Sequence, residues 1–148
     1  STIQAAILLE KLEIFPGEIK KRQEVVDNYN KHLSKLNLGL KLPYLKVKFK
    51  SSWAQYTVIL PDDINRELLQ EKLKLKNVPT AVYYPIPINE HKPYNHYPVS
   101  KAGLETTYKL SKTVLSLPMH PYLNEKDIIY ITQSISEAIK LIKWGKFK

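Results

Sequence analysis

The stretch Tyr83–Tyr94 contains the residue types in this sequence that are best suited to binding a ligand. It opens with two tyrosines, continues through Pro85 and Pro87, and then carries polar side chains and a histidine. Prolines restrict a loop in advance, so less conformational freedom is lost when a ligand binds. A tyrosine adds an apolar ring and a hydroxyl that exchanges hydrogen bonds. This composition indicates recognition of a polar, ring-bearing ligand, and the alternative interpretation is a well-packed surface loop.

Other common catalytic and cofactor-binding motifs do not occur in the sequence. The glycines are isolated and form no phosphate-binding loop between a strand and a helix. No Gly-x-Ser-x-Gly turn exposes a nucleophilic serine, and the absence of cysteine excludes thiol chemistry. His91 and His96 lie close together beside Glu90, but this pair lacks a further ligand at zinc-site spacing. The sequence therefore disfavours a metal site and an autonomous nucleotide-binding motif.

The 148-residue chain is basic, with a formal net charge of +9 from 23 basic and 14 acidic residues. Only Arg22 and Arg66 are arginines, although the planar guanidinium is the favoured group for bidentate contacts to phosphate and guanine. The lysines are spread over every segment, and the aromatic signature of RNA-binding sheets is missing. We therefore expect no nucleic-acid partner. No apolar run approaches the ~20 residues that span a bilayer, so we also expect no membrane partner and a cytoplasmic location.

Apolar residues at helical spacing predict five helices. The predicted ranges are Thr2–Phe15, Glu18–Leu36, Ile64–Lys76, Leu104–Thr113 and Glu125–Lys143. We expect Pro16 and Gly17 to end the first helix, because proline lacks the amide hydrogen that a helix needs. Asp63 and Asn124 are the expected N-caps of the helices that follow them. The apolar arc of the first helix is too wide for one partner surface, which predicts an exposed apolar face.

Alternating or short apolar runs predict the strands. Residues 45–49 and 53–60 are expected to pair as a hairpin across Lys50-Ser51-Ser52, and Thr80–Tyr84 and Val114–Leu117 are expected as short strands. Helices outnumber strands, and no repeat or linker divides the chain. The predicted fold class is therefore α+β, with a small antiparallel or mixed sheet covered by helices on one face.

Four blocks of the sequence resemble one protein family. They are Thr2–Leu12 (TIQAAILLEKL), Ser52–Thr57 (SWAQYT), Val78–Pro87 (VPTAVYYPIP) and Val114–Leu123 (VLSLPMHPYL). In order and spacing they are similar to the C-terminal part of the DegT/StrS family of pyridoxal-phosphate sugar aminotransferases. The pattern is most similar to that of enzymes that aminate a 3-keto UDP-N-acetylhexuronic acid for surface polysaccharide.

The resemblance implies a domain assignment. Residues 1–148 would be the C-terminal small domain of a fold-type I aminotransferase, with residues 1–36 as its helical connection to a large domain absent from this sequence. The sequence opens with Ser1 and no secretory leader, which also favours a segment cut from a longer protein. In the family the Schiff-base lysine lies in the large domain, so we expect this chain to be inactive by itself and to bind no pyridoxal phosphate. The full-length enzyme would be a homodimer that uses pyridoxal phosphate, a nucleotide-linked keto-sugar and an amino donor such as glutamate.

The resemblance also assigns candidate substrate contacts. In such enzymes the Tyr-Tyr-Pro-x-Pro loop contributes to the sugar-nucleotide pocket. The corresponding residues here are Tyr83, Tyr84, Asn89 and His91. The family commonly has a histidine after Pro-Leu, whereas this chain has Ile88-Asn89, with His91 two residues further on. A different class of function stays open, in which the lysines and the tyrosines form a stand-alone basic module for an anionic partner.

Overall fold

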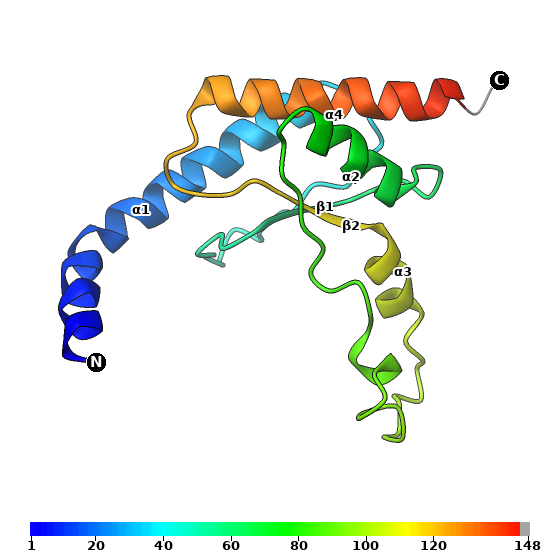
Figure 1. Cartoon of the computed structure of the whole chain (residues 1–148), viewed down its shortest axis with the longest axis horizontal. Helices are drawn as coiled ribbons and strands as arrows, with labels where there is room; N and C mark the ends of the chain where they lie inside the picture. The colour runs from blue at the N-terminus through cyan, green and yellow to red at the C-terminus, as the bar shows by residue number, and fades with distance from the viewer. Residues whose placement is uncertain (146–148) are drawn as a thin grey trace.

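A computed structural model describes residues 1–145 of the chain (Figure 1). The helices are α1 (Thr2–Ser34), α2 (Arg66–Leu75), α3 (Glu105–Thr113) and α4 (Glu125–Gly145), with a short 3-10 helix, η1 (Ile88–Glu90). The strands are β1 (Tyr56–Ile59) and β2 (Val114–Leu117). Among these residues, no helix is both long and apolar enough to cross a membrane.

β1 and β2 form a two-stranded antiparallel sheet in which Tyr56 lies opposite Leu117 and Ile59 lies opposite Val114. The predicted strand at 114–117 is confirmed, and β1 lies inside the predicted range 53–60. On the other edge of β1, Lys41 and Ile59 exchange two backbone hydrogen bonds of 3.0 Å. In the described structure the second edge of β1 is therefore paired only at Ile59.

The predicted hairpin between residues 45–49 and 53–60 is wrong. Residues 46–49 form a turn that the amide of Phe49 closes by donating to the carbonyl of Lys46 over 2.9 Å. The side chain of Val47 is fully exposed. Alternating apolar residues stabilise a strand only where a neighbouring strand and a buried face are available. The chain meets this edge of β1 only at Lys41 and then leaves it, so residues 45–49 turn back without a strand partner.

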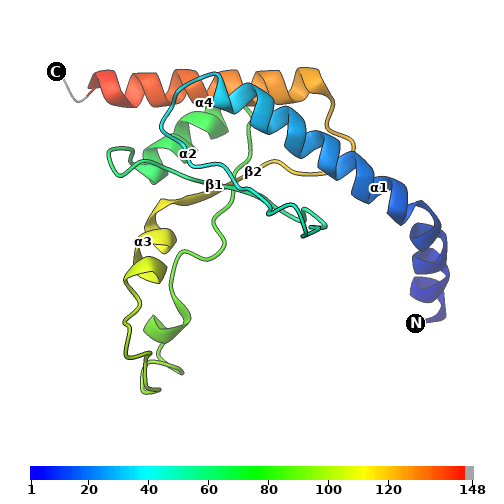
Figure 2. The same cartoon turned by 180° about the vertical axis from the view of Figure 1, so that it is seen from behind.

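Three helices cover one side of the sheet and enclose the core. Figures 1 and 2, which view the molecule from opposite sides, both show the C-terminal half of α1 together with α2 and α4 above the β-sheet, and α3 projecting below it. Apolar side chains at helical spacing provide the buried faces of these three helices. The principal ones are Val25, Val26, Tyr29 and Leu33 of α1, Leu69 and Leu73 of α2, and Ile128, Ile135 and Ile139 of α4. The α+β fold with helices on one face is confirmed.

The predicted break at Pro16 and Gly17 is wrong, since α1 continues through both residues. Figure 1 shows its dark-blue N-terminal part bent away from the rest of the helix. A proline inside a helix removes one hydrogen bond and pushes its ring against the preceding turn, which bends the helix without always ending it. The predicted exposed apolar face is confirmed, with Ile3 75% and Leu12 62% exposed.

The other helices begin close to their predicted starts. The cap of α2 is Asn65 and not the predicted Asp63, because the Asn65 carboxamide oxygen accepts from the Leu68 amide over 2.7 Å. Asn124 caps α4 as predicted, since its side-chain oxygen accepts from the amide of Asp127 over 3.0 Å. Asp127 accepts in return from the Asn124 amide. The predicted helix at 104–113 is confirmed as α3.

The predicted buried strand Thr80–Tyr84 is wrong. Its only sheet contact in the described structure is a bridge at Ala81, which exchanges backbone hydrogen bonds of 3.1 and 2.8 Å with Ser116. The next residues leave the sheet, and Tyr84 is 78% exposed. Pro85 and Pro87 lack the amide hydrogen that a strand ladder needs. Residues 83–113, called the arm below, therefore extend away from the core (Figure 1).

Candidate functional site

The arm contains a pocket of about 510 Å³ between two walls. One wall is the tyrosine loop, residues 83–94, and the other is α3 with the start of β2. The lining residues are Tyr83, Tyr84, Ile86, Pro87, Ile88 and His91 from the loop, and Thr107, Leu110, Ser111 and Val114 from the other wall. The volume lies in the range of small-molecule pockets, which are mostly apolar with a few polar groups. We call this the first pocket.

Three of the four residues predicted from sequence meet in the first pocket. Tyr83, Tyr84 and His91 all line it. The two tyrosine rings lie edge to face, with centroids 6.2 Å apart and planes at 78°. Tyr83 is 49% exposed, so both hydroxyl-bearing rings are accessible from solvent. The pocket therefore presents two phenol groups and an imidazole to a ligand.

Asn89 lies outside the lining of the first pocket. Its side-chain nitrogen donates to the hydroxyl of Tyr108 on α3 over 2.8 Å. This bond joins the tyrosine loop to α3, the two elements that form the walls. Sequence reasoning missed Tyr108, although it shares one face of the predicted helix 104–113 with Leu104 and Ser111 at i, i+4 and i, i+3 spacing.

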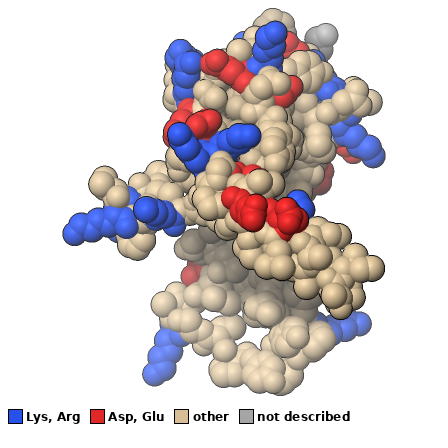
Figure 3. Space-filling model, turned by 90° about the vertical axis from the view of Figure 1, so that its left-hand side faces the viewer, with Lys and Arg blue, Asp and Glu red and all other residues tan. Residues whose placement is uncertain are grey.

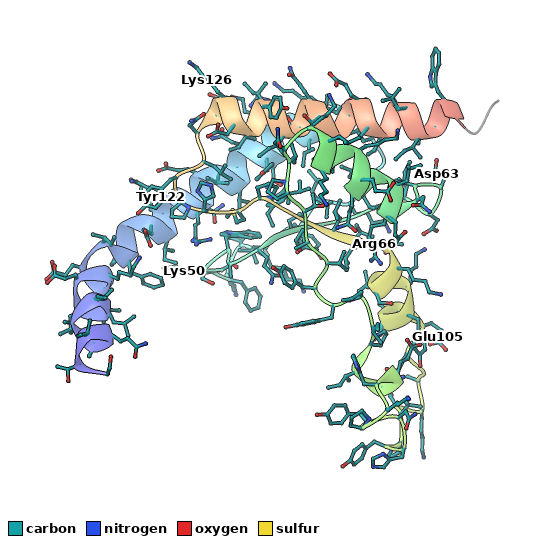
Figure 4. The ribbon with its side chains drawn as sticks, in the orientation of Figure 1. Lys50, Asp63, Arg66, Glu105, Tyr122 and Lys126 are labelled. Atoms are coloured by element: carbon teal, nitrogen blue, oxygen red, sulfur yellow. The ribbon has the colours of Figure 1, made fainter. Side chains whose placement is uncertain are left out.

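The α3 wall is fastened to the core by Arg66, a second residue that sequence reasoning missed. The Arg66 guanidinium is buried where α3 meets β2, and its Nη1 donates to the carbonyls of Ser111 and Val114 (Figure 4). The last carbonyls of a helix have no partner inside it, and a positive charge there complements the helix dipole. Nη2 also lies 3.3 Å from the carboxylate of Glu67. Arg66 therefore sets the position of two residues that line the pocket.

The lining side chains suit binding better than covalent chemistry. No lysine, aspartate or glutamate lines the first pocket. The Ser111 hydroxyl is already engaged, since it donates to the backbone carbonyl of Tyr108 over 2.9 Å. Among the described residues, no group of three histidine or acidic side chains gathers to hold a metal ion. The pocket can orient a ligand through hydroxyl groups, an imidazole and apolar contact.

On the face drawn in Figure 3 the basic residues do not form one continuous surface. In Figure 3 the blue lysine and arginine side chains lie in separate groups, with tan and red atoms between them. The lower part of that view, which is the arm, is mainly tan. Several lysines are also paired with carboxylates on other elements, such as Lys31 with Glu125 and Lys109 with Asp62. This distribution agrees with the diffuse lysine pattern of the sequence.

Comparison with known proteins shows the family to which this chain belongs. A profile of the DegT/DnrJ/EryC1/StrS aminotransferase family matches residues 1–136, and the chain belongs to this family. A solved DegT/DnrJ/EryC1/StrS aminotransferase from Brucella abortus superposes with a TM-score of 0.82 at 38% identity, over 90% of this chain and 34% of that one.

Two curated relatives carry more specific names. The chain is 44% identical over 135 residues to UDP-2-acetamido-2-deoxy-3-oxo-D-glucuronate aminotransferase of Pseudomonas aeruginosa, a match covering 91% of this chain and 35% of the relative. It is 28% identical, over 93% of its length and 35% of the relative, to UDP-N-acetyl-3-dehydro-alpha-D-glucosamine 3-aminotransferase of Acidithiobacillus ferrooxidans. The chain thus spans about a third of the length of these relatives.

Proposed function

We propose that this chain is the C-terminal small domain of a pyridoxal-phosphate-dependent aminotransferase that acts on a nucleotide-linked keto-sugar for surface polysaccharide. In this proposal α1 connects the domain to a large domain, and the first pocket forms part of the substrate site. The observation that carries the proposal is the first pocket itself, in which the family's Tyr-Tyr-Pro-x-Pro loop faces α3 and presents Tyr83, Tyr84 and His91. Family membership and the names of the two relatives support the reaction class.

Pyridoxal phosphate does not fit the first pocket as a complete site. The cofactor needs a lysine amine for its covalent attachment, and no lysine lines this pocket. In aminotransferases the cofactor supplies the electron sink for moving an amino group, while the protein binds and orients the reactants. We propose that this chain helps to bind and orient the reactants. A lysine from outside this chain would hold the cofactor, and glutamate is the proposed amino donor.

The tyrosine loop is suited to holding a sugar in one orientation. A phenol hydroxyl both donates and accepts, so Tyr83 and Tyr84 can bond to sugar hydroxyl or carboxylate oxygens. Each such bond contributes about 0.5–1.5 kcal/mol net, and more when the acceptor is charged. The apolar lining from Ile86, Ile88 and Leu110 keeps part of the ligand surface away from water. Together these groups favour one pose of the keto-sugar.

The exposed half of α1 supports the domain proposal. Its apolar side chains contact little of the rest of the chain, and Ile3, Leu8 and Leu9 are each more than half exposed. Exposed apolar patches on proteins mark surfaces that other protein surfaces cover. We propose that the large domain covers this part of α1, that the full-length enzyme is a homodimer, and that it works in the cytoplasm.

A binding titration of the 148-residue chain tests the proposal. The ligand is UDP-2-acetamido-2-deoxy-D-glucuronate, the unreactive 3-hydroxy counterpart of the ketone named for the Pseudomonas relative. We expect it to shift the amide signals of residues 83–91 and 107–114 in a ¹H–¹⁵N spectrum. Tyr84→Phe should weaken binding about two- to twelvefold, because one hydrogen bond of about 0.5–1.5 kcal/mol is lost.

The matched control is Tyr44→Phe. Tyr44 is 81% exposed, close to the 78% of Tyr84, but it lies outside the arm. The control variant should bind as the unaltered chain does. If Tyr84→Phe leaves the affinity unchanged, the tyrosine loop is an ordinary surface loop. If RNA binds below micromolar concentration at physiological salt and the nucleotide sugar does not bind, the basic-module function replaces this proposal.

A further inference from the structure

Residues 44–50, called the basic turn below, project from the molecule next to the sheet. Figures 1 and 2 both show them in a loop that extends beyond the N-terminal end of β1, between the lower part of α1 and the arm. The apolar side chains of the turn face outward, since Tyr44 is 81% exposed, Phe49 is 65% exposed and Val47 is fully exposed. The turn therefore presents an apolar tip to its surroundings.

Three lysines alternate with the apolar residues of the basic turn. Lys46, Lys48 and Lys50 are all exposed, and none of them forms an ion pair within residues 1–145. Figure 4 labels Lys50, which lies on this loop. The sequence from 28 to 61 contains no aspartate or glutamate. The apolar tip is therefore combined with three positive charges that have no carboxylate partner in the described structure.

The loop that carries the basic turn is fastened to α1 through Trp53, which is buried. The indole Nε1 of Trp53 donates to the side-chain oxygen of Gln23 over 2.7 Å, and its carbonyl accepts from Arg22 Nη1 over 3.0 Å. The Trp53 amide donates to the hydroxyl of Ser51 over 3.0 Å. Because one end of the loop is held in this way, less conformational freedom is lost when the turn binds a surface.

This combination of groups favours one kind of anionic partner. A nucleic acid would bind the lysines through its phosphates but would give Val47 and Phe49 no apolar contact. A protein partner would need a recess that matches the protruding tip. A lipid bilayer needs no such recess, because its interface takes up apolar side chains while anionic headgroups attract lysines. The basic turn thus fits an anionic lipid surface best.

The exposed half of α1 is the other apolar surface to compare. Its residues 2–15 contain Glu10, Lys11 and Glu13, so one lysine stands against two glutamates and the formal charge is −1. An anionic bilayer does not attract a surface of that charge. The apolar face of α1 therefore suits the protein cover proposed above, whereas the basic turn suits lipid.

We propose that the basic turn binds an anionic lipid surface, with Val47 and Phe49 in the interfacial layer and the three lysines among the headgroups. The sequence prediction of no membrane partner rested on the absence of an apolar run of spanning length, and a peripheral contact needs no such run. The anionic leaflet of a cell membrane faces the cytoplasm, which is the proposed location of the enzyme. The inference does not depend on the keto-sugar assignment.

Cosedimentation of the 148-residue chain with lipid vesicles tests the role of the lysines. We expect binding to an equal mixture of phosphatidylcholine and phosphatidylglycerol, and little binding to phosphatidylcholine alone. Replacing Lys46, Lys48 and Lys50 together by glutamine should weaken binding about tenfold or more, since each lysine near an anionic surface contributes about fivefold. The control triple variant, which removes the same charge from exposed lysines elsewhere, should bind nearly as the unaltered chain does. Its changes are Lys35→Gln, Lys101→Gln and Lys126→Gln.

A second pair of variants tests the apolar tip. Val47→Ser combined with Phe49→Ser should weaken binding to the mixed vesicles about fivefold or more, because apolar side chains no longer enter the interface. Leu75→Ser is the control, since Leu75 is 86% exposed but lies on α2. As an independent measurement, Val47→Trp should add tryptophan emission that moves to shorter wavelength when mixed vesicles are present.

Three outcomes would overturn the inference. The first is equal binding to both vesicle types, or equal losses for the two lysine triple variants. The second is loss of vesicle binding in Leu8→Ser with Leu12→Ser while the turn variants still bind, which would assign the contact to α1. The third is binding to polyglutamate as tight as to mixed vesicles, with vesicle binding retained by the serine variants of the turn. The nucleotide-sugar titration described above judges the proposed function separately.

Discussion

The side-chain amide of Asn89 donates to the hydroxyl of Tyr108 over 2.8 Å, and this bond joins the two walls of the first pocket. Asn89 belongs to η1 in the tyrosine loop, whereas Tyr108 belongs to α3. Neither side chain lines the first pocket. Their effect on a ligand in the first pocket is therefore indirect, because the bond holds the loop at a fixed distance from the helix, whereas Asn89 itself lines an adjoining pocket.

Replacing Tyr108 by phenylalanine removes the acceptor while it keeps the ring. We expect the affinity for the nucleotide-sugar analogue to fall about two- to tenfold, because the loop loses a bond of about 0.5–1.5 kcal/mol that holds it near α3. Isothermal titration calorimetry measures the change. Tyr130→Phe is the control. Tyr130 lies on α4, away from the arm, and its hydroxyl donates to the carbonyl of Lys76 over 2.9 Å. Equal affinities for the two variants would show that the bond does not position the loop.

Replacing Arg66 by methionine should loosen α3. The change leaves the carbonyls of Ser111 and Val114 without their buried donor, and we expect unfolding to become easier by about 1–3 kcal/mol. Arg66→Lys should lose less, because it keeps a positive charge near the helix end. Chemical denaturation gives the free energy of unfolding, and hydrogen exchange reports the amides of residues 109–113. Unchanged exchange in these amides would contradict the role of Arg66.

Two leucines of α2 test the location of the core. Leu69 is fully buried, whereas Leu75 is 86% exposed. Leu69→Ala should reduce the free energy of unfolding by about 2–5 kcal/mol, because it removes buried apolar surface and leaves a cavity. Leu75→Ala should change it by less than about 0.5 kcal/mol, as is usual for surface positions. Similar losses for both variants would contradict the assignment of Leu69 to the buried face of α2.

The ion pair between α1 and α4 should make stability depend on pH. Lys31, with His32 as a second partner, holds the pKa of the Glu125 carboxyl below its ordinary value of 4.5. A carboxyl with a lowered pKa in the folded state stabilises that state above pH 4.5, and the contribution disappears as the pH falls through the lowered pKa.

Glu125→Gln should therefore lower the melting temperature at pH 7 and have a smaller effect at pH 2.5, because protonation of the carboxyl removes the charge that Lys31 stabilises. Thermal melts at the two pH values make the comparison. Glu71→Gln is the control, because Glu71 forms no ion pair in the described structure. A destabilisation by Glu125→Gln that is the same at both pH values would rule out the ion pair as its source.

The features predicted correctly from sequence are those that neighbouring residues determine. The isoleucines of α4 repeat at helical spacing after Asn124, so both the helix and its cap follow from local chemistry. The four sequence blocks identified the family in the same way, because each motif is contiguous. The tyrosine loop was chosen as a candidate site because its prolines and tyrosines adjoin one another, and its role in substrate binding stays a prediction. Three of its four proposed contact residues line the first pocket.

The tertiary structure decided how distant segments pair. The partner of β1 is β2, in which Leu117, opposite Tyr56, lies 61 positions further along the chain. No local pattern chooses between that edge and the nearby residues 45–49. The sequence did not show that α1 continues through Pro16, because a proline can either bend a helix or end it. No sequence pattern pairs Asn89 with Tyr108, and their bond exists only because the arm folds back onto itself. Pairing across long loops depends on which surfaces remain free once the core has formed, and that information lies outside any short stretch of chain.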